Sequence, residues 1–450
     1  MKKLWQKNAV RLNPVIEVFE TKGDLILDQK LVKYDVWGSV AQAKMLNKIG
    51  IITPNELSSV IAGLQDILKL NEQNKFILEA GDEDVHTKIE NYLTEKCGEV
   101  GKKIHTGRSR NDQVLTVIRL FSKEQLILIW QELITLENSF LKFAKKFQSV
   151  AMPGYTHLQK AMPSTVGLWA LAFLESLLDD SKSISHAYEL NNQSPLGSAA
   201  GFGVPLGLDR AYSAKLLGFA KVQINPVYCQ NSRGKIEAEI VASLIQILAT
   251  INKFASDVLL FTTAEFNYFT ISESLCSGSS IMPQKKNVDV AELLKSKVHL
   301  VLGYYIQLIS LSNNLFSGYN RDLQDSKKPL MESFEIVLDS LKVADILINN
   351  LTPNKEKLLS SLTPEIFATH RAFELVKKDI PFREAYQMVG SSNQDIRIKD
   401  IDKLLKLSTH IGGTGNLGLK LFEKEVGLSK VGFAEEENHF YLSIKKLLEN

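Results

Sequence analysis

Residues 236–259 read IEAEIVASLIQILATINKFASDVL, and the apolar side chains in this stretch repeat with the period of an α-helix. They recur three or four positions apart, as at Ile240, Leu244 and Ile247. This spacing collects them on one side of a helix. The apolar side is broad enough to contact two neighbours, so the stretch predicts a helix inside a bundle.

Similar apolar stripes occur at 115–148, 165–190, 289–313 and 332–349, whereas the alternating pattern of strands is nearly absent. Proline is missing from 55–152 and from 227–282. This leaves room for helices far longer than the average of about 11 residues. We therefore predict an all-α fold with five long helices between residues 115 and 350.

Glycine and small polar residues interrupt the helical pattern at 151–163, 194–210 and 272–287, which we predict to be loops. Loops held at the ends of rigid helices are where binding groups usually lie. The changes of pattern along the chain suggest three segments. We predict an N-terminal domain over 1–110, a central long-helix bundle over 111–355 that includes the loop 272–287, and a small helical C-terminal domain over 356–450.

The composition excludes several classes of partner. The chain has 53 Lys and Arg against 51 Asp and Glu, so no net field favours nucleic acid or an anionic membrane. The most apolar stretch, residues 240–261, contains Gln246, Lys253 and Asp257, which a bilayer would penalise. It therefore reads as a buried core helix.

Cysteine usage and the first residues point to a compartment. Only Cys97, Cys229 and Cys276 occur, and their wide spacing fits neither a disulfide framework nor a zinc site. The charged start lacks the apolar run of a secretory signal. We expect a cytoplasmic protein with no nucleic-acid or membrane partner.

Residues 278–287, GSSIMPQKKN, combine a flexible glycine-serine start with two lysines and an amide. A mobile hydroxyl beside cations suits chemistry on an anionic substrate. From the residues alone, a solvated loop between helices explains the same composition, so both readings stay open at this point.

This stretch resembles the signature loop of the fumarase and aspartase superfamily, whose members eliminate fumarate from succinyl compounds. Two more stretches follow the order expected of that superfamily, HTGRSRND at 105–112 and PGYTHLQ at 153–159. Both are similar to the argininosuccinate lyase family rather than to fumarase, aspartase or adenylosuccinate lyase. Further landmarks, such as YNRDLQDSK at 319–327 and PFREA at 381–385, extend the resemblance to roughly residues 28–420.

The resemblance implies a fold, an assembly and an activity. It implies a three-domain subunit whose five-helix bundle joins a tetrameric helical core, and a homotetramer whose active sites take residues from three subunits. The implied activity is that of a carbon–nitrogen lyase splitting argininosuccinate into fumarate and L-arginine, the last step of arginine biosynthesis. No metal is expected, since the histidines lack ligand spacing, and no organic cofactor is implied.

The resemblance also assigns the catalytic groups. Elimination needs a base for the carbon-bound proton, cations and N–H donors for the resulting aci-carboxylate, and an acid at the leaving nitrogen. The matching family positions imply that Ser279 is the base and that His157 is the acid or proton relay, oriented by Glu292. They also imply that Lys285 donates to the substrate carboxylates. The opposite assignment of Ser279 and His157 stays open.

A second set of residues is implied to bind the substrate. Two of them have a structural alternative: Tyr319 as a packing residue, and Lys327 as a solvated charge on a helix. Asn111, Thr156 and Asn287 are implied to hydrogen-bond the substrate carboxylates, and Ser109 and Arg110 to form a turn that binds an anion. The residues implied to hold the arginine part and its carboxylate are Tyr319, Gln324 and Lys327.

The sequence departs from the family at several positions. The usual opening phrase is replaced by Leu4-Trp5-Gln6-Lys7, Val288 replaces a proline after the signature loop, and residues 231–235, NSRGK, replace an acidic pattern. Asp24 stands where the family usually has a serine. A carboxylate there would repel a substrate carboxylate and attract a guanidinium or an amine.

Three alternatives to the implied activity stay open. The first, which the departures suggest, is a lyase of the same superfamily that acts on another N-substituted aspartate or succinate. The second is a catalytically idle structural relative of the crystallin kind, and the third is a purely helical scaffold or binding bundle.

Overall fold

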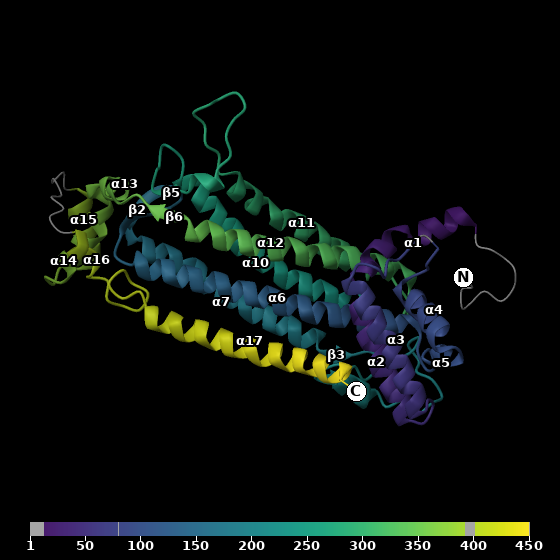
Figure 1. Ribbon diagram of the computed structural model, residues 1–450. Helices are drawn as coiled ribbons and strands as arrows, with labels where there is room; N and C mark the ends of the chain where they lie inside the picture. The colour runs from purple at the N-terminus through teal and green to yellow at the C-terminus, as the bar shows by residue number, and fades with distance from the viewer. Residues whose placement is uncertain (1–12, 80, 392–400, 450) are drawn as a thin grey trace.

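The computed structural model describes residues 13–79, 81–391 and 401–449. Its centre is a bundle of long rods lying side by side (Figure 1). The five predicted long helices are all present, which confirms the all-α prediction. They are α6 (Arg110–Lys146), α7 (Val166–Asn191), α10 (Lys235–Phe261), α11 (Asp289–Leu311) and α12 (Lys327–Asn349).

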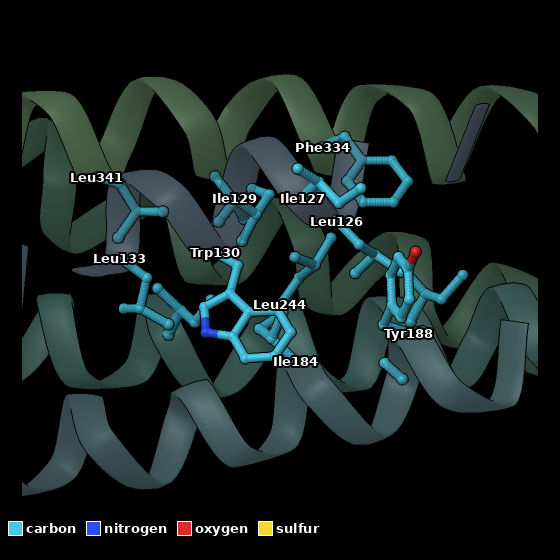
Figure 2. Packing of buried hydrophobic residues seen from close by; sticks show 14 of the residues in the cluster. Leu126, Ile127, Ile129, Trp130, Leu133, Ile184, Tyr188, Leu244, Phe334 and Leu341 are labelled. Carbon is cyan, nitrogen blue, oxygen red and sulfur yellow. The ribbon is translucent and has the colours of Figure 1, made fainter. Parts of the chain in front are cut away.

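Helix α10 occupies the middle of the bundle, packed against α7, α11 and α12. Figure 2 shows Leu126 and Trp130 of α6, Ile184 of α7, Leu244 of α10 and Phe334 of α12 within one cluster of buried hydrophobic side chains. By length and composition alone α10 could cross a membrane. Its apolar stripe is instead buried against the neighbouring helices, as expected of a core helix.

The start of α6 is fixed by two sets of hydrogen bonds. Asp112 accepts from the backbone N–H of Ser109, and Ser109 Oγ accepts from the N–H of Asn111, which forms a capping box. The other oxygen of Asp112 accepts from the N–H groups of Gly197 and Ala199 at 2.8 and 3.0 Å. Burial raises the pKa of Asp112 to about 6. These bonds lock the first turn of α6 to the loop that follows α7.

The N-terminal helices gather at the end of the bundle where α6 and α12 begin (Figure 1). We call this end the pocket end. The helices are α1 (Pro14–Gln29), α2 (Val32–Lys48), α3 (Pro54–Glu72), α4 (Val85–Cys97) and α5 (Glu99–Lys103). Short elements at the same end are β3 (Gln193–Ser194), α8 (Arg210–Leu216), β4 (Lys221–Val222), α9 (Pro226–Asn231) and the 3-10 turn η2 (Arg321–Ser326).

The opposite end, which we call the hairpin end, carries the short strands and the small C-terminal helices. Strand β1 (Ala151–Thr156) pairs antiparallel with β2 (Gln159–Thr165), and β5 (Phe269–Ile271) pairs with β6 (Leu351–Pro353). The helical elements are η1 (Glu273–Leu275), α13 (Lys355–Ser360), η3 (Pro364–Phe367), α14 (Ala368–Val376), α15 (Phe382–Gly390) and α16 (Ile401–Leu405).

The prediction of a loop over 151–163 was wrong, because this stretch forms the β1–β2 hairpin. Its two turn residues, His157 and Leu158, have φ values of 52° and 59°. Two-residue hairpin turns with positive φ usually contain glycine or asparagine. The usual sequence signal of a hairpin is therefore missing here.

Helix α17 (Leu419–Leu448) starts near the small C-terminal helices and runs back along the bundle against α6, α2 and α8 (Figure 1). The predicted domain boundaries at 110 and 355 remain predictions. The third segment nevertheless contains one long helix that packs on the bundle, which the sequence pattern did not indicate.

Candidate active site

The residues predicted to form one site lie at two ends of the subunit. Helix α6 alone is 37 residues long, or about 55 Å. Within one subunit the two groups are therefore far apart. The hairpin end holds Thr156, His157, Ser279, Lys285, Asn287 and Glu292, and the pocket end holds Ser109, Arg110, Asn111, Tyr319, Gln324 and Lys327.

The signature loop, residues 272–287, projects from the bundle between β5 and α11 (Figure 1). Its neck is closed by two backbone hydrogen bonds of 2.9 Å between Ser277 and Asn287. The Ser277 hydroxyl also donates to Asp289 in the first turn of α11. The residues between the neck positions thus form a closed excursion attached to a rigid helix.

Ser279 is half-buried within this excursion. Its Oγ accepts from the backbone N–H groups of Ile281 and Met282 at 3.3 and 3.1 Å. Donors aimed at an oxygen stabilise its anionic form. The loop therefore supplies the amide donors that a serine base needs.

The two lysines of the loop differ in their partners. Lys286 forms an ion pair with Glu273. Lys285 is exposed, and among the described residues it has no ion-pair partner. Of the two, Lys285 is the cation available to an incoming anion.

The β1–β2 hairpin presents His157 at its tip. His157 and the neighbouring Leu158 are exposed and lie in the left-handed region of backbone conformation, which is strained for residues other than glycine. The hairpin itself is well anchored, because the Tyr155 and Tyr268 hydroxyls lie 2.5 Å apart and Lys160 Nζ donates to the Ser361 carbonyl. An imidazole is thus held outward on a fixed support.

Glu292 lies exposed in the first turn of α11. No hydrogen bond or ion pair joins it to His157 within the part of the subunit that the structure describes. The expected orientation of His157 by Glu292 therefore stays a prediction, and it requires a group from outside this subunit or a movement within it.

The pocket end contains a cavity of about 210 Å³. It gathers five of the predicted substrate-binding residues and also Asp24, the main departure from the family pattern. Its walls are Glu20, Asp24, Asp28, Glu83, Asp84, His86, Arg110, Asn111, Val114, Arg233, Tyr319, Arg321, Gln324 and Lys327. Ser109 does not line it but caps the helix that positions Arg110 and Asn111.

Lys327 is 2% exposed and forms ion pairs with Asp24 at 2.6 Å and Asp28 at 2.7 Å. Burial lowers the pKa of Lys327, but the two carboxylates outweigh it and raise the pKa overall. Burial raises the pKa of Asp24 despite its pairing with Lys327. The alternative of a solvated helix charge is excluded for Lys327.

Other side chains that line the cavity are also held by ion pairs and hydrogen bonds. Arg110 pairs with Glu83 at 2.7 Å and with Asp84 at 3.3 Å. Gln324 donates to the carbonyl of Glu20 at 2.9 Å. Most charges of this pocket are therefore paired within a single subunit.

Arg233 is a cavity residue that the sequence interpretation missed. It immediately precedes Gly234, the N-cap of α10, and its side chain is buried. The available signal was an arginine in the segment directly before the most apolar helix of the chain. From the sequence, that segment stands out only as a departure from the family pattern. No group of three or more His, Cys, Asp or Glu side chains in the described ranges is placed to hold a metal ion.

Comparison with known sequences gives consistent matches. Residues 12–303 match the family described as Lyase. An argininosuccinate lyase from Thermotoga neapolitana is 44% identical, covering 86% of this chain and 97% of the relative. Argininosuccinate lyases from Phocaeicola vulgatus and Sorangium cellulosum are 40% and 38% identical, covering 92% and 93% of this chain and 92% and 96% of those relatives.

Solved structures share the architecture at lower identity. EDDS lyase in complex with formate superposes with a TM-score of 0.80 at 21% identity, covering 98% of this chain and 95% of that one. A structure described as fumarate lyase:delta crystallin from Brucella melitensis gives a TM-score of 0.71 at 17% identity, covering 95% and 97%. At these identities the likeness concerns the fold.

Proposed function

The chain belongs to the argininosuccinate lyase family, and from this premise we propose how its own residues carry the reaction. It is a carbon–nitrogen lyase that eliminates fumarate from argininosuccinate and releases L-arginine, as in the last step of arginine biosynthesis. The observation that carries this activity is the 38–44% identity to argininosuccinate lyases over 86–93% of the chain. These relatives favour it over the alternatives raised from the sequence.

In the proposed mechanism Ser279 Oγ removes a proton from the carbon next to a substrate carboxylate. The electron pair moves into that carboxylate to give a doubly charged aci-carboxylate, which Lys285 and Asn287 stabilise. The amide donors from Ile281 and Met282 support a serine base, because they lower the free energy of its alkoxide. An otherwise weak base becomes usable when the closed site excludes water.

Cleavage follows when the electrons return from the aci-carboxylate to form the double bond of fumarate and the carbon–nitrogen bond breaks. His157 donates a proton to the leaving guanidino nitrogen, directly or through water. Its outward position at the hairpin tip supports a role toward a substrate bound outside its own subunit. In this scheme Glu292 orients the imidazole.

The pocket end is proposed to bind the substrate. Asn111 binds a carboxylate, to which Thr156 from the hairpin end of another subunit also donates, while Tyr319 and Gln324 contact the arginine part. Ser109 and Arg110 complete the turn that holds Asn111 at the start of α6. Lys327 belongs to the same wall, where it anchors Asp24 and Asp28.

We propose a homotetramer in which subunits pack antiparallel, so that the hairpin end of one meets the pocket ends of others. The separation of the two residue groups supports this arrangement, since no single subunit brings them together. Exposed apolar side chains support self-association as well. On α11 these are Leu293, Leu300, Leu302, Ile306 and Ile309.

We also propose a cytoplasmic location. The three cysteines are free in the structure, which suits a reducing compartment. The ligand is a small molecule, and the near-neutral charge balance offers no general attraction to nucleic acid.

The activity is tested by following fumarate absorbance after purified protein is added to argininosuccinate. Ser279→Ala should lower kcat by about 10² to 10⁴. Ser280→Ala, a change in the next residue of the same loop, is the matched control and should lower kcat far less. A folded unmutated protein that forms no fumarate would refute the activity, and an active Ser279→Ala enzyme would refute the serine base.

The shared site is tested by mixing two inactive variants, Ser279→Ala and Asn111→Ala, which alter opposite ends of the subunit. Random reassembly should restore about a quarter of the unmutated activity, because a fraction of the sites then receives an intact group from each end. Mass measurement confirms that mixed tetramers have formed. Mixed tetramers without recovered activity would refute the shared site.

A further inference from the structure

The Arg233 guanidinium is an unusual wall of the cavity at the pocket end. The residue is 3% exposed, and its Nε is buried without a hydrogen-bond partner. Within the described residues its side chain also has no ion pair. Burying a guanidinium without a paired anion is unfavourable, so such a group usually serves a ligand or a partner.

The other cations around the cavity are already neutralised. Lys327 lies between Asp24 and Asp28, and Arg110 pairs with Glu83 and Asp84. Arg321, another cation of the cavity wall, also has a partner, because it lies 3.2 Å from Glu20. Among the described cations that line this cavity, only Arg233 is left without a carboxylate partner. A carboxylate entering the cavity would meet Arg233 as its unoccupied cation.

Asp24 and Asp28, in contrast to Arg233, carry more negative charge than their partner neutralises. Two carboxylates share the single positive charge of Lys327, which leaves an excess of negative charge at that point. Asp24 is 14% exposed and therefore open to the cavity, whereas Asp28 is 1% exposed. The charge of Arg233 also acts on Asp24 and lowers its pKa, opposing the larger effect of burial. An ammonium group is the complement of the Asp24 position.

An unpaired guanidinium beside an under-neutralised carboxylate is the complement of an amino-acid zwitterion. We infer that Arg233 binds the α-carboxylate of the arginine part of the substrate and that Asp24 binds its α-ammonium. The inference rests on the proposed function, because it assumes that the arginine part occupies this cavity. It differs from the expectation drawn from the family, in which Lys327 receives that carboxylate.

Three ligands separate the two contacts in the fumarate assay. L-arginine carries both groups, agmatine lacks the carboxylate, and 5-guanidinopentanoate lacks the amine. Arg233→Gln should raise the inhibition constant of L-arginine and of 5-guanidinopentanoate about 10- to 100-fold, and leave that of agmatine unchanged. Arg233→Lys should restore part of the loss, because it keeps the charge but not the planar fork.

Asp24→Ser should give the complementary pattern. The inhibition constants of L-arginine and agmatine should rise, whereas that of 5-guanidinopentanoate should stay unchanged. Arg321→Gln is the matched control, since this cavity arginine is already paired with Glu20. It should change the three inhibition constants by a similar and smaller factor.

The result that would overturn the inference is an equal weakening of L-arginine and agmatine by Arg233→Gln, which would mark a purely structural cation. If Arg233→Gln does not fold, the same selectivity is read from Arg233→Lys, and its absence there would overturn the inference. Calorimetric binding of the three ligands to the unmutated protein gives an independent readout. Failure of the proposed function is distinct, because the unmutated protein would then form no fumarate.

Discussion

The two ends of the bundle prepare their chemical groups in opposite ways. At the pocket end most charged side chains of the cavity are already paired, as with Lys327 between Asp24 and Asp28, and Arg233 is the buried exception. At the hairpin end His157 and Lys285 are exposed. The cavity at the pocket end exists within a single subunit, whereas the groups at the hairpin end are proposed to act on a substrate held by another subunit.

This difference indicates which end contributes to stability and which to reactivity. Removing a buried partner at the pocket end leaves uncompensated charge, which destabilises the fold. Removing an exposed group at the hairpin end leaves the fold nearly unchanged, so the loss appears in the reaction rate. The four predictions below test that division, starting with the largest effect.

The largest effect is expected for His157→Asn. The rate constant kcat should fall by about 10² to 10⁴, because the leaving nitrogen loses its proposed acid. The thermal midpoint should barely change, since the side chain is exposed. The measurement is kcat beside the melting temperature of the same preparation. A variant that melts much earlier would break the division between the two ends.

Lys327→Met should lower the free energy of unfolding by about 3–5 kcal/mol, because Asp24 and Asp28 lose their shared cation. Urea unfolding at neutral pH measures this change in the free energy of unfolding. Lys328→Met is the matched control, since its side chain is 64% exposed and the oxygen of Glu332 lies 3.8 Å away. A further Asp28→Asn change should restore part of the loss. Equal stability of the two lysine variants would contradict the expected role of burial.

Helix α6 buries opposite charges in its two halves. Burial lowers the pKa of the Lys123 ammonium from 10.5 to about 7. Burial likewise raises the pKa of the Glu137 carboxyl from 4.5 to about 7. The half nearer the pocket end therefore favours loss of a proton on folding, and the half nearer the hairpin end favours uptake.

These shifts predict opposite pH dependences, each on the order of a few kcal/mol over its window. Between pH 7 and 10.5 the unfolded chain holds a proton on Lys123 that the folded chain lacks, so stability rises with pH. Between pH 4.5 and 7 the folded chain holds a proton on Glu137 that the unfolded chain lacks, so stability falls with pH. Lys123→Met should remove the rise and Glu137→Gln the fall, measured as urea midpoints across pH. Curves parallel to that of the unmutated protein would refute the assignment.

The smallest effect is expected at the hairpin turn. Leu158→Gly should stabilise the protein by up to about 1 kcal/mol, because glycine adopts the φ of 59° without strain. Met162→Gly in the extended strand β2 is the control and should destabilise it. Thermal melting measures both. A destabilised Leu158→Gly variant would show that the leucine side chain makes a contact that outweighs the strain.

The long helices could be predicted because each carries its own apolar period, as in residues 236–259. Helix α17 could not, since several of its apolar residues, such as Leu421 and Leu428, are more than half exposed. The β1–β2 hairpin escaped prediction because the turn residues His157 and Leu158 are not the residues that usually mark one.

The candidate site residues and their sharing between subunits come from resemblance and stay predictions, whereas the contacts that build the pocket end could not be predicted. The pair between Lys327 and Asp28 joins positions 299 apart in the sequence, a contact that no local pattern specifies. Arg233 was missed because its meaning depends on whether neighbouring cations are already paired, which only three-dimensional contacts show. The altered opening at residues 4–7 lies outside the described residues.

The length of α6 has a consequence for how the enzyme responds to its own concentration. If each reaction centre needs ends from separate chains, catalysis is subject to mass action between identical molecules. Specific activity should then decline on dilution while each chain keeps its helices, and it should return on reconcentration. The amount of working catalyst would vary more steeply than the amount of polypeptide, so that a modest drop in expression would produce a disproportionate drop in flux.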